Sequence, residues 1–81
     1  MKDFEDKILQ SIIDNMFDKS IKIKDNDEFI NDLGFDSIRL MGLFYSLEDE
    51  FEIDIINGDK NYLFFSIVTV GDLKEIMKKI I

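Results

Sequence analysis

The stretch from Leu33 to Phe51 constrains the fold of this chain more than any other. It opens on a glycine turn and passes through Asp36-Ser37 into a segment whose apolar residues recur every three or four positions. That spacing is the period of a helix with one buried face. We therefore predict a helix here, with Gly34 in an unusual backbone conformation and Asp36 or Ser37 as its N-cap. The positions expected to be buried are Ile38, Leu40, Met41, Leu43, Phe44, Leu47 and Phe51.

Three further segments favour helix. Residues 2–18 show the same apolar period, with Phe4, Ile8, Ile12 and Met16 among the inward positions. Residues 69–72 read Thr-Val-Gly-Asp, which matches a capping box before a last helix. Residues 61–68 are almost wholly apolar, and because a single strand would have no partner, we predict a short helix and a loop there. The sequence thus predicts an all-α, four-helix bundle of three longer helices and one short helix, forming a single domain over residues 1–81.

A long connection, residues 19–35, joins the first two helices. A structureless loop of that length is unusual in a compact domain, so we expect apolar anchors and a helical turn near residues 27–32. A loop that spans the domain would leave its flanking helices roughly parallel. The expected anchors are Ile21, Ile23, Phe29, Ile30 and Leu33.

The composition excludes several kinds of active site. The chain contains no cysteine and no histidine, so a thiolate metal site, a cysteine nucleophile and a Ser-His hydrolase are all ruled out. The acidic segment that starts at Asp25 has Phe29 and Ile30 where a calcium loop needs an oxygen ligand and a glycine, so we expect no metal site. Arg39 stays protonated and cannot act as a base for Ser37. We expect no catalytic activity from the domain itself.

The net charge of −8 restricts the partners. Such a domain repels nucleic acid phosphates and anionic membrane surfaces, so neither is an expected partner. Most of the acidic excess lies in residues 24–59, where eleven acidic side chains accompany only Lys24 and Arg39. The chain opens without a signal pattern and has no apolar run long enough to span a membrane. We expect a cytoplasmic monomer.

Ser37 has two possible roles at the start of the predicted helix. A serine at this place is often a structural N-cap. Alternatively, its hydroxyl carries a covalent group, and a phosphodiester would be stabilised there because the first N–H groups of a helix point outward. In the second case Ser37 is an acceptor that another enzyme modifies.

Three motifs resemble those of the acyl and peptidyl carrier protein family. Residues 33–38, LGFDSI, look like the family's LGxDSL with Ile38 for leucine. Residues 47–53, LEDEFEI, look like LExEFxI, and residues 69–73 read TVGDL. Together the motifs cover the chain in order. The resemblance implies that a phosphopantetheinyl transferase with Mg²⁺ attaches 4′-phosphopantetheine from coenzyme A to Ser37, and that Asp36 contacts the transferase and its metal or caps the helix.

The resemblance leaves the pathway open. The form LGFDS, and the likeness of residues 64–70 to LFxxPTV with Val68 for proline, favour a polyketide or nonribosomal peptide carrier. Arg39 and Gly42 stand where fatty-acid carriers usually have acids, whereas the acids of residues 48–50 are fatty-acid-like. A housekeeping fatty-acid carrier is the alternative, and an unmodified acidic interaction module is the competing class. The implied partners are an adenylating enzyme, an acyltransferase, and a ketosynthase or condensation enzyme.

Partner enzymes are expected to contact the predicted helix and the loop before it. Charge complementarity with basic enzymes would make these contacts fast and sensitive to salt. An aromatic patch at residues 62–65 is a further candidate, with at least one of its rings expected to be buried. The candidate recognition residues are Phe35, Ile38, Arg39, Met41, Tyr45, Glu48 and Asp49.

Overall fold

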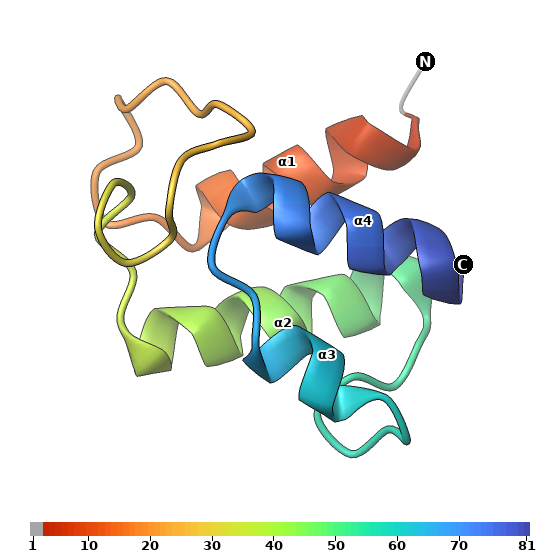
Figure 1. The fold of residues 1–81 in the computed structure, drawn as a ribbon. Helices are drawn as coiled ribbons and strands as arrows, with labels where there is room; N and C mark the ends of the chain where they lie inside the picture. The colour runs from red at the N-terminus through yellow and green to blue at the C-terminus, as the bar shows by residue number, and fades with distance from the viewer. Residues whose placement is uncertain (1–2) are drawn as a thin grey trace.

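The computed structural model describes residues 3–81, and these residues form four helices without a strand. The helices are α1 (Phe4–Asp14), α2 (Ser37–Phe51), α3 (Asn61–Phe65) and α4 (Val70–Ile80), as Figure 1 shows. The all-α prediction of three longer helices, one short helix and a long connection between the first two is confirmed. No helix within the described part of the chain is long and apolar enough to cross a membrane.

α1 is shorter than the predicted helix over residues 2–18, whose first position lies outside the described residues. Asp3 caps its start, and its carboxylate accepts a hydrogen bond from the Asp6 N–H at 2.8 Å. The helix ends at Asp14 because the next residues turn tightly, with the Asn15 N–H bonded to the Ile12 carbonyl at 3.1 Å. The Lys19 ammonium then donates to the carbonyls of Ile13, Asp14 and Met16 around this helix end.

α1 and α2 are antiparallel, so the prediction that they are roughly parallel is wrong (Figure 1). The first ring of α1, Phe4, packs edge-on against Phe51 at the end of α2, with 5.7 Å between ring centroids. At the opposite end, the Asn15 side chain donates to the Ser46 hydroxyl at 3.0 Å. α4 runs in the same direction as α2.

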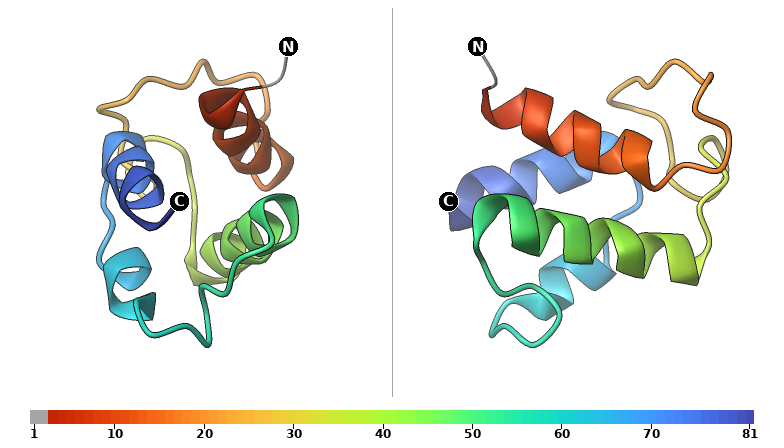
Figure 2. Two further views of the ribbon diagram at one scale, coloured as in Figure 1. Left: turned by 90° about the vertical axis from the view of Figure 1, so that its right-hand side faces the viewer. Right: turned by 180° about the vertical axis from the view of Figure 1, so that it is seen from behind.

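The connection between α1 and α2 does not run the length of the bundle. It crosses from the end of α1 to the start of α4 and returns, as the views in Figure 2 show. Backbone hydrogen bonds hold it there: the Val70 N–H donates to the Asp27 carbonyl at 3.0 Å, and the Gly71 N–H donates to the Asp25 carbonyl at 2.7 Å. Because both ends of the connection lie at the same end of the bundle, the flanking helices are antiparallel.

The expected helical turn within this connection is present. The N–H groups of Asp32 and Leu33 both bond to the Glu28 carbonyl, at 2.9 and 3.1 Å. Of the predicted anchors, Phe29 and Leu33 are buried, and Ile21 and Ile23 pack partly buried against the core. Ile30 is 62% exposed, so its prediction as an anchor was wrong.

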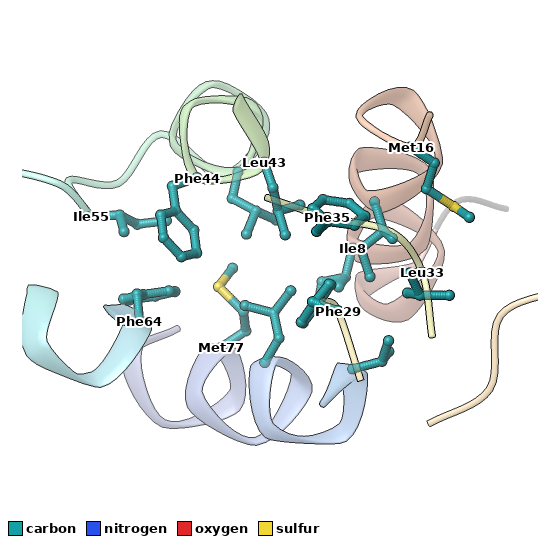
Figure 3. Close-up of a cluster of buried hydrophobic side chains, with 14 residues drawn as sticks. Ile8, Met16, Phe29, Leu33, Phe35, Leu43, Phe44, Ile55, Phe64 and Met77 are labelled. Carbon is teal, nitrogen blue, oxygen red and sulfur yellow. The ribbon is translucent and has the colours of Figure 1, made fainter. Parts of the chain in front are cut away.

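The core lies between the four helices and the returning connection. Figure 3 shows Phe44 of α2 facing Phe64 of α3, with Met77 of α4 beside them. The Phe44 and Phe64 rings meet edge to face at 5.8 Å, an arrangement that aromatic pairs favour. Residues with no exposed surface include Ile8, Ile12, Leu43, Leu47, Ile55, Val70, Leu73 and Met77.

The predicted capping box at the start of α4 is present. The Thr69 hydroxyl accepts from the Asp72 N–H at 3.1 Å, and the Asp72 carboxylate accepts from the Thr69 N–H at 3.0 Å. These backbone donors, first Thr69 and then Val68, lower the pKa of the Asp72 carboxyl. One turn later Lys74 lies 2.7 Å from the Asp25 carboxylate, and this hydrogen bond raises the pKa of its ammonium. The start of α4 is thus tied to the connection by backbone and side chains.

Candidate functional site

The start of α2 is built by the three residues before it. Gly34 has a φ of +73°, the left-handed conformation that the sequence predicted. The next N–H, that of Phe35, bonds to the Phe29 carbonyl at 2.8 Å and fixes the return of the chain. Asp36 is then extended, and its carboxylate accepts from the Arg39 N–H at 2.8 Å. Asp36 is therefore the N-cap of α2.

Ser37 is the first residue of α2, and the interpretation of its side chain as the N-cap is wrong. Asp36 already supplies the cap. The Ser37 side chain is exposed, and its hydroxyl makes no hydrogen bond with any of residues 3–81. A hydroxyl at this position is accessible, and it lies where the dipole of α2 favours negative charge.

The other four serines differ from Ser37 because their hydroxyls are all engaged. The Ser11 hydroxyl is buried and donates to the Lys7 carbonyl at 3.0 Å. The Ser46 hydroxyl accepts from Asn15, and that of Ser20 donates to Asp18 at 2.6 Å. The Ser66 hydroxyl donates back into α3, to the Leu63 carbonyl at 3.0 Å. Geometry therefore singles out Ser37 among the serines.

Phe35 was a predicted recognition residue, and the structure places it in the core instead. Its side chain is 3% exposed, and its ring meets Phe29 edge to face at 5.2 Å. A ring so placed orients the turn before Ser37 but presents no surface to a partner. The sequence pattern was ambiguous because Phe35 lies in a loop, where no periodicity assigns it to a face.

Ile38 was predicted to be buried in the apolar face of α2, and this was wrong because it is 81% exposed. Met41 is half-buried, and Tyr45 is 58% exposed. These side chains lie beside Ser37 along the outer surface of α2. Together with Ser37 and Gly42 they line an open hollow of about 420 Å³, which we call the α2 groove. Ile38, Met41 and Tyr45 thus remain available for contact with another molecule.

Arg39 and Gly42 lie toward the end of α1, and packing accounts for both. The Arg39 guanidinium donates to the Asn15 carbonyl at 3.3 Å and lies 5.1 Å from the centroid of the Phe17 ring. At Gly42, a Cβ atom would come within 2.5 Å of Asn15 Oδ1. The close approach of α1 therefore explains why residue 42 has no side chain, and the absence of an acid there is weak evidence about the pathway.

Glu48, which was predicted to be part of an acidic recognition cluster, has a structural role as well. Its carboxylate accepts from the N–H groups of Ile55 and Ile56 at 2.8 and 2.9 Å, which anchors the chain after α2. Asp49 is exposed and remains a candidate for contact. Glu48 and Asp49 border an open hollow of about 690 Å³ that also includes Glu52 and Asp54.

The remaining candidates are the aromatic patch of α3 and the acidic side chains. In α3, Phe64 is buried while Tyr62 and Phe65 are exposed, as expected for a partly buried aromatic patch. Within residues 3–81 the acidic side chains form no group of three or more that is arranged to hold a metal ion. The structure therefore concentrates the functional candidates at the start of α2.

Comparisons with known proteins match almost the whole chain. A family model described as a phosphopantetheine attachment site matches residues 7–76. The chain is 30% identical over 79 residues to an acyl carrier protein of Sinorhizobium fredii (strain NBRC 101917 / NGR234), covering 98% of this chain and 96% of that protein. The identity and coverage are the same for the acyl carrier protein AcpP of Rhizobium meliloti (strain 1021). The matched region includes Asp36, Ser37 and the whole of α2.

Proposed function

Because the chain belongs to the phosphopantetheine-binding family of acyl carrier proteins, we propose that Ser37 is the residue that bears its 4′-phosphopantetheine. Members of this family carry the group covalently and are carriers rather than catalysts. The observation that carries the proposal is the state of the hydroxyls: Ser37 alone among the serines is exposed and unbonded within residues 3–81.

The residues at the start of α2 fit such a group. An acceptor serine needs an accessible hydroxyl but no base of its own, since the transferase takes its proton. Arg39, which is held against Asn15 and Phe17, stays protonated and leaves the Ser37 hydroxyl free. The first N–H groups of α2 are not used by intrahelical bonds, so a phosphodiester on Ser37 would be stabilised by them and by the helix dipole. Once bound, the group supplies a terminal thiol, which a chain without cysteine lacks.

We assign distinct roles to the residues around the acceptor. Ser37 supplies the oxygen that becomes the phosphodiester oxygen, and the transferase accepts its proton. Asp36 holds the first turn of α2 through one carboxylate oxygen and contacts the transferase and its Mg²⁺ through the other. Ile38, Met41, Tyr45 and Asp49 form the contact surface for pathway enzymes. The buried Phe35 does not belong to that surface, and Glu48 and Arg39 contribute to it at its edges.

For the pathway, we propose a polyketide or nonribosomal peptide assembly line, with residues 1–81 acting as one cytoplasmic, monomeric carrier domain. The LGFDS form and the likeness of residues 64–70 to LFxxPTV support this assignment. A housekeeping fatty-acid carrier is the second candidate, and the description of both relatives as acyl carrier proteins favours it. Charging the modified form with an adenylating enzyme or with a malonyl transferase separates the two pathways.

One experiment tests the carrier role. The unmodified protein is incubated with a promiscuous phosphopantetheinyl transferase, coenzyme A and Mg²⁺, and its intact mass is recorded. We expect a complete gain of one phosphopantetheine in the wild type and none in Ser37→Ala. An unmodified wild type, or the same gain in Ser37→Ala, would favour an interaction module that only shares the carrier fold.

A further inference from the structure

We infer that Arg39 and Phe17 form a cationic platform beside Ser37 that binds a carboxylate on the surface of a pathway enzyme. The inference rests on the proposed attachment at Ser37. It adds a specificity element whose charge is opposite to that of the domain as a whole. The enzyme that docks here is therefore acidic at one point, with an apolar side chain next to the acid.

Arg39 carries a charge that no acid of the domain pairs directly. It is the only basic residue in the strongly acidic stretch 25–59. Although Arg39 is half-buried, it forms no ion pair within the described part of the chain. Two acids line the same hollow, but their carboxylates are bonded elsewhere: Asp14 accepts from Gln10, and Asp36 accepts from a backbone N–H, each at 2.8 Å. The guanidinium is thus left without a carboxylate partner.

Contacts with the end of α1 hold the guanidinium of Arg39 in place. One of its N–H groups donates to the Asn15 carbonyl at 3.3 Å, and the group lies over the Phe17 ring at 5.1 Å from the centroid. Asn15 is itself fixed, because its side chain donates to the Ser11 carbonyl at 2.8 Å and to the Ser46 hydroxyl at 3.0 Å. A guanidinium stacked on a ring keeps its edge donors for a planar carboxylate. Since the side chain is already ordered, little rotamer freedom is lost on binding.

Exposed apolar side chains accompany this charge. Ile38, at 81%, and Phe17, at 78%, are the most exposed large apolar side chains within residues 3–81. Phe17 contacts the guanidinium, and Ile38 lines the same hollow as Arg39. Covering these side chains contributes to binding and excludes water, which strengthens an ion pair formed beside them. The complementary surface is therefore a carboxylate adjacent to an apolar side chain.

A phosphodiester on Ser37 fits this charge less well than a carboxylate from outside. Residues two apart on a helix do not face each other, so Ser37 and Arg39 lie on different sides of α2. The Arg39 side chain is also held toward the end of α1 by Asn15 and Phe17. Its free donors are therefore available to an enzyme that approaches Ser37 from the side of α1.

The first test detects the carboxylate directly. Phosphopantetheinylated Arg39→Lys keeps the charge and offers a primary amine, which a zero-length carbodiimide joins to a carboxylate as an amide while the carbodiimide becomes its urea. The partner is the enzyme that charges the wild type, either an adenylating enzyme or a malonyl transferase. We expect tandem mass spectrometry to find position 39 joined to an acid of that enzyme. Cross-links from other lysines, with none from position 39, would overturn the inference.

Charge variants test the sign of the opposing surface. An acidic surface repels Arg39→Glu, whereas a basic one attracts it. We expect the KM of loading to rise about threefold in Arg39→Gln and about tenfold in Arg39→Glu, with kcat within about twofold of the wild type. The control, Lys79→Glu, makes the same change in net charge in the last turn of α4, at the opposite end of the bundle, and should leave KM unchanged. A lower KM in Arg39→Glu, or an equal rise in Lys79→Glu, would contradict an acidic contact.

Phe17→Ser tests whether the ring and the guanidinium act together. We expect its KM to rise about threefold and not to add to the rise in Arg39→Gln, because the two side chains form one contact. A KM equal to that of the wild type would overturn the shared platform. Intact mass separates this inference from the carrier role. A protein that never gains phosphopantetheine overturns both, whereas a modified protein whose KM is unchanged in Arg39→Glu overturns the platform alone.

Discussion

α2 and α4 begin with the same capping geometry, but the hydroxyl at the start of α4 is hydrogen-bonded and the one at the start of α2 is not. Both N-caps have extended backbones, at φ −124° for Asp36 and −111° for Thr69. Each cap accepts a hydrogen bond from the N–H three residues later, at 2.8 Å in α2 and 3.1 Å in α4. At α4 the hydroxyl of Thr69 is itself the cap. At α2 a carboxylate is the cap, so the hydroxyl of the next residue, Ser37, is left unbonded.

The two helix starts also differ in the side chain of their third residue. In α4 the Asp72 carboxylate turns back to the N–H groups of Thr69 and Val68 and closes the helix start. In α2 the equivalent residue is Arg39, whose side chain points away from the helix start and contacts Asn15 and Phe17. Which residue supplies the cap therefore decides whether a hydroxyl at a helix start is structural or free for chemistry.

The largest expected effect on stability lies at the other end of α2, where Glu48 anchors the chain that follows. Glu48→Ala leaves the N–H groups of Ile55 and Ile56 without their acceptor, which costs about 1–3 kcal/mol in the free energy of unfolding. Urea denaturation measures this loss. Asp49→Ala, one residue on and exposed, is the control and should change the free energy by less than about 0.5 kcal/mol. Equal losses would mean that Glu48 anchors nothing.

The closed start of α4 should matter for stability but not for modification. Replacing Thr69 and Asp72 together by alanine removes both halves of the capping box and should cost about 1–2 kcal/mol. The rate of phosphopantetheine transfer to Ser37 should stay at the wild-type value, measured by intact mass over time. A large fall in that rate would show that the two helix starts are not independent.

Two variants of Asp36 distinguish its role as the N-cap of α2 from its proposed contact with the transferase. Asp36→Ala should cost about 1 kcal/mol of stability, whereas Asp36→Asn keeps a side-chain acceptor and should cost only a few tenths. If the charge also contacts the transferase and its metal, both variants should be modified at least tenfold more slowly. Wild-type modification of Asp36→Asn would leave Asp36 with the capping role alone.

The stability that the start of α4 contributes should depend on pH. Hydrogen bonds from Thr69 and Val68 lower the pKa of Asp72 in the folded state. The resulting stability is present above the ordinary carboxyl pKa of about 3.9 and is lost as the pH falls through the lowered value. The stability difference between wild type and Asp72→Ala should thus shrink between pH 6 and pH 3. A constant difference across that range would contradict a role for the carboxylate charge.

The smallest expected effect on stability is that of Ser37→Ala. Its hydroxyl bonds to nothing within residues 3–81, so the free energy of unfolding should change by less than about 0.5 kcal/mol. Thr69→Ala is the matched loss of a hydroxyl at a helix start and should cost about 1 kcal/mol. Similar losses at both positions would remove the distinction between them.

Local patterns predicted the parts of the molecule that local chemistry determines. The capping box at Thr69, the left-handed Gly34 and the short α3 all follow from neighbouring residues. The direction of α2 was missed because it depends on backbone bonds between residues 25–29 and 68–71, which no local period reveals.

The site was predicted in the same uneven way. Ser37 was proposed from a motif and a helix start, and the structure confirms Asp36 only as the N-cap. The places of Phe35, Ile38 and Glu48 depend on tertiary packing: a loop ring fills the core, an apolar side chain lies outside it, and an acid bonds two backbone N–H groups. Hydrophobicity and charge alone do not distinguish these outcomes.

The most direct test of the central claim is to locate the modification within the protein. Wild-type protein is modified to completion, digested, and sequenced by tandem mass spectrometry. The account predicts that the whole phosphopantetheine mass lies on Ser37 and none on Thr69 or any engaged serine. The mass on one of those bonded hydroxyls, with Ser37 unmodified, would contradict it.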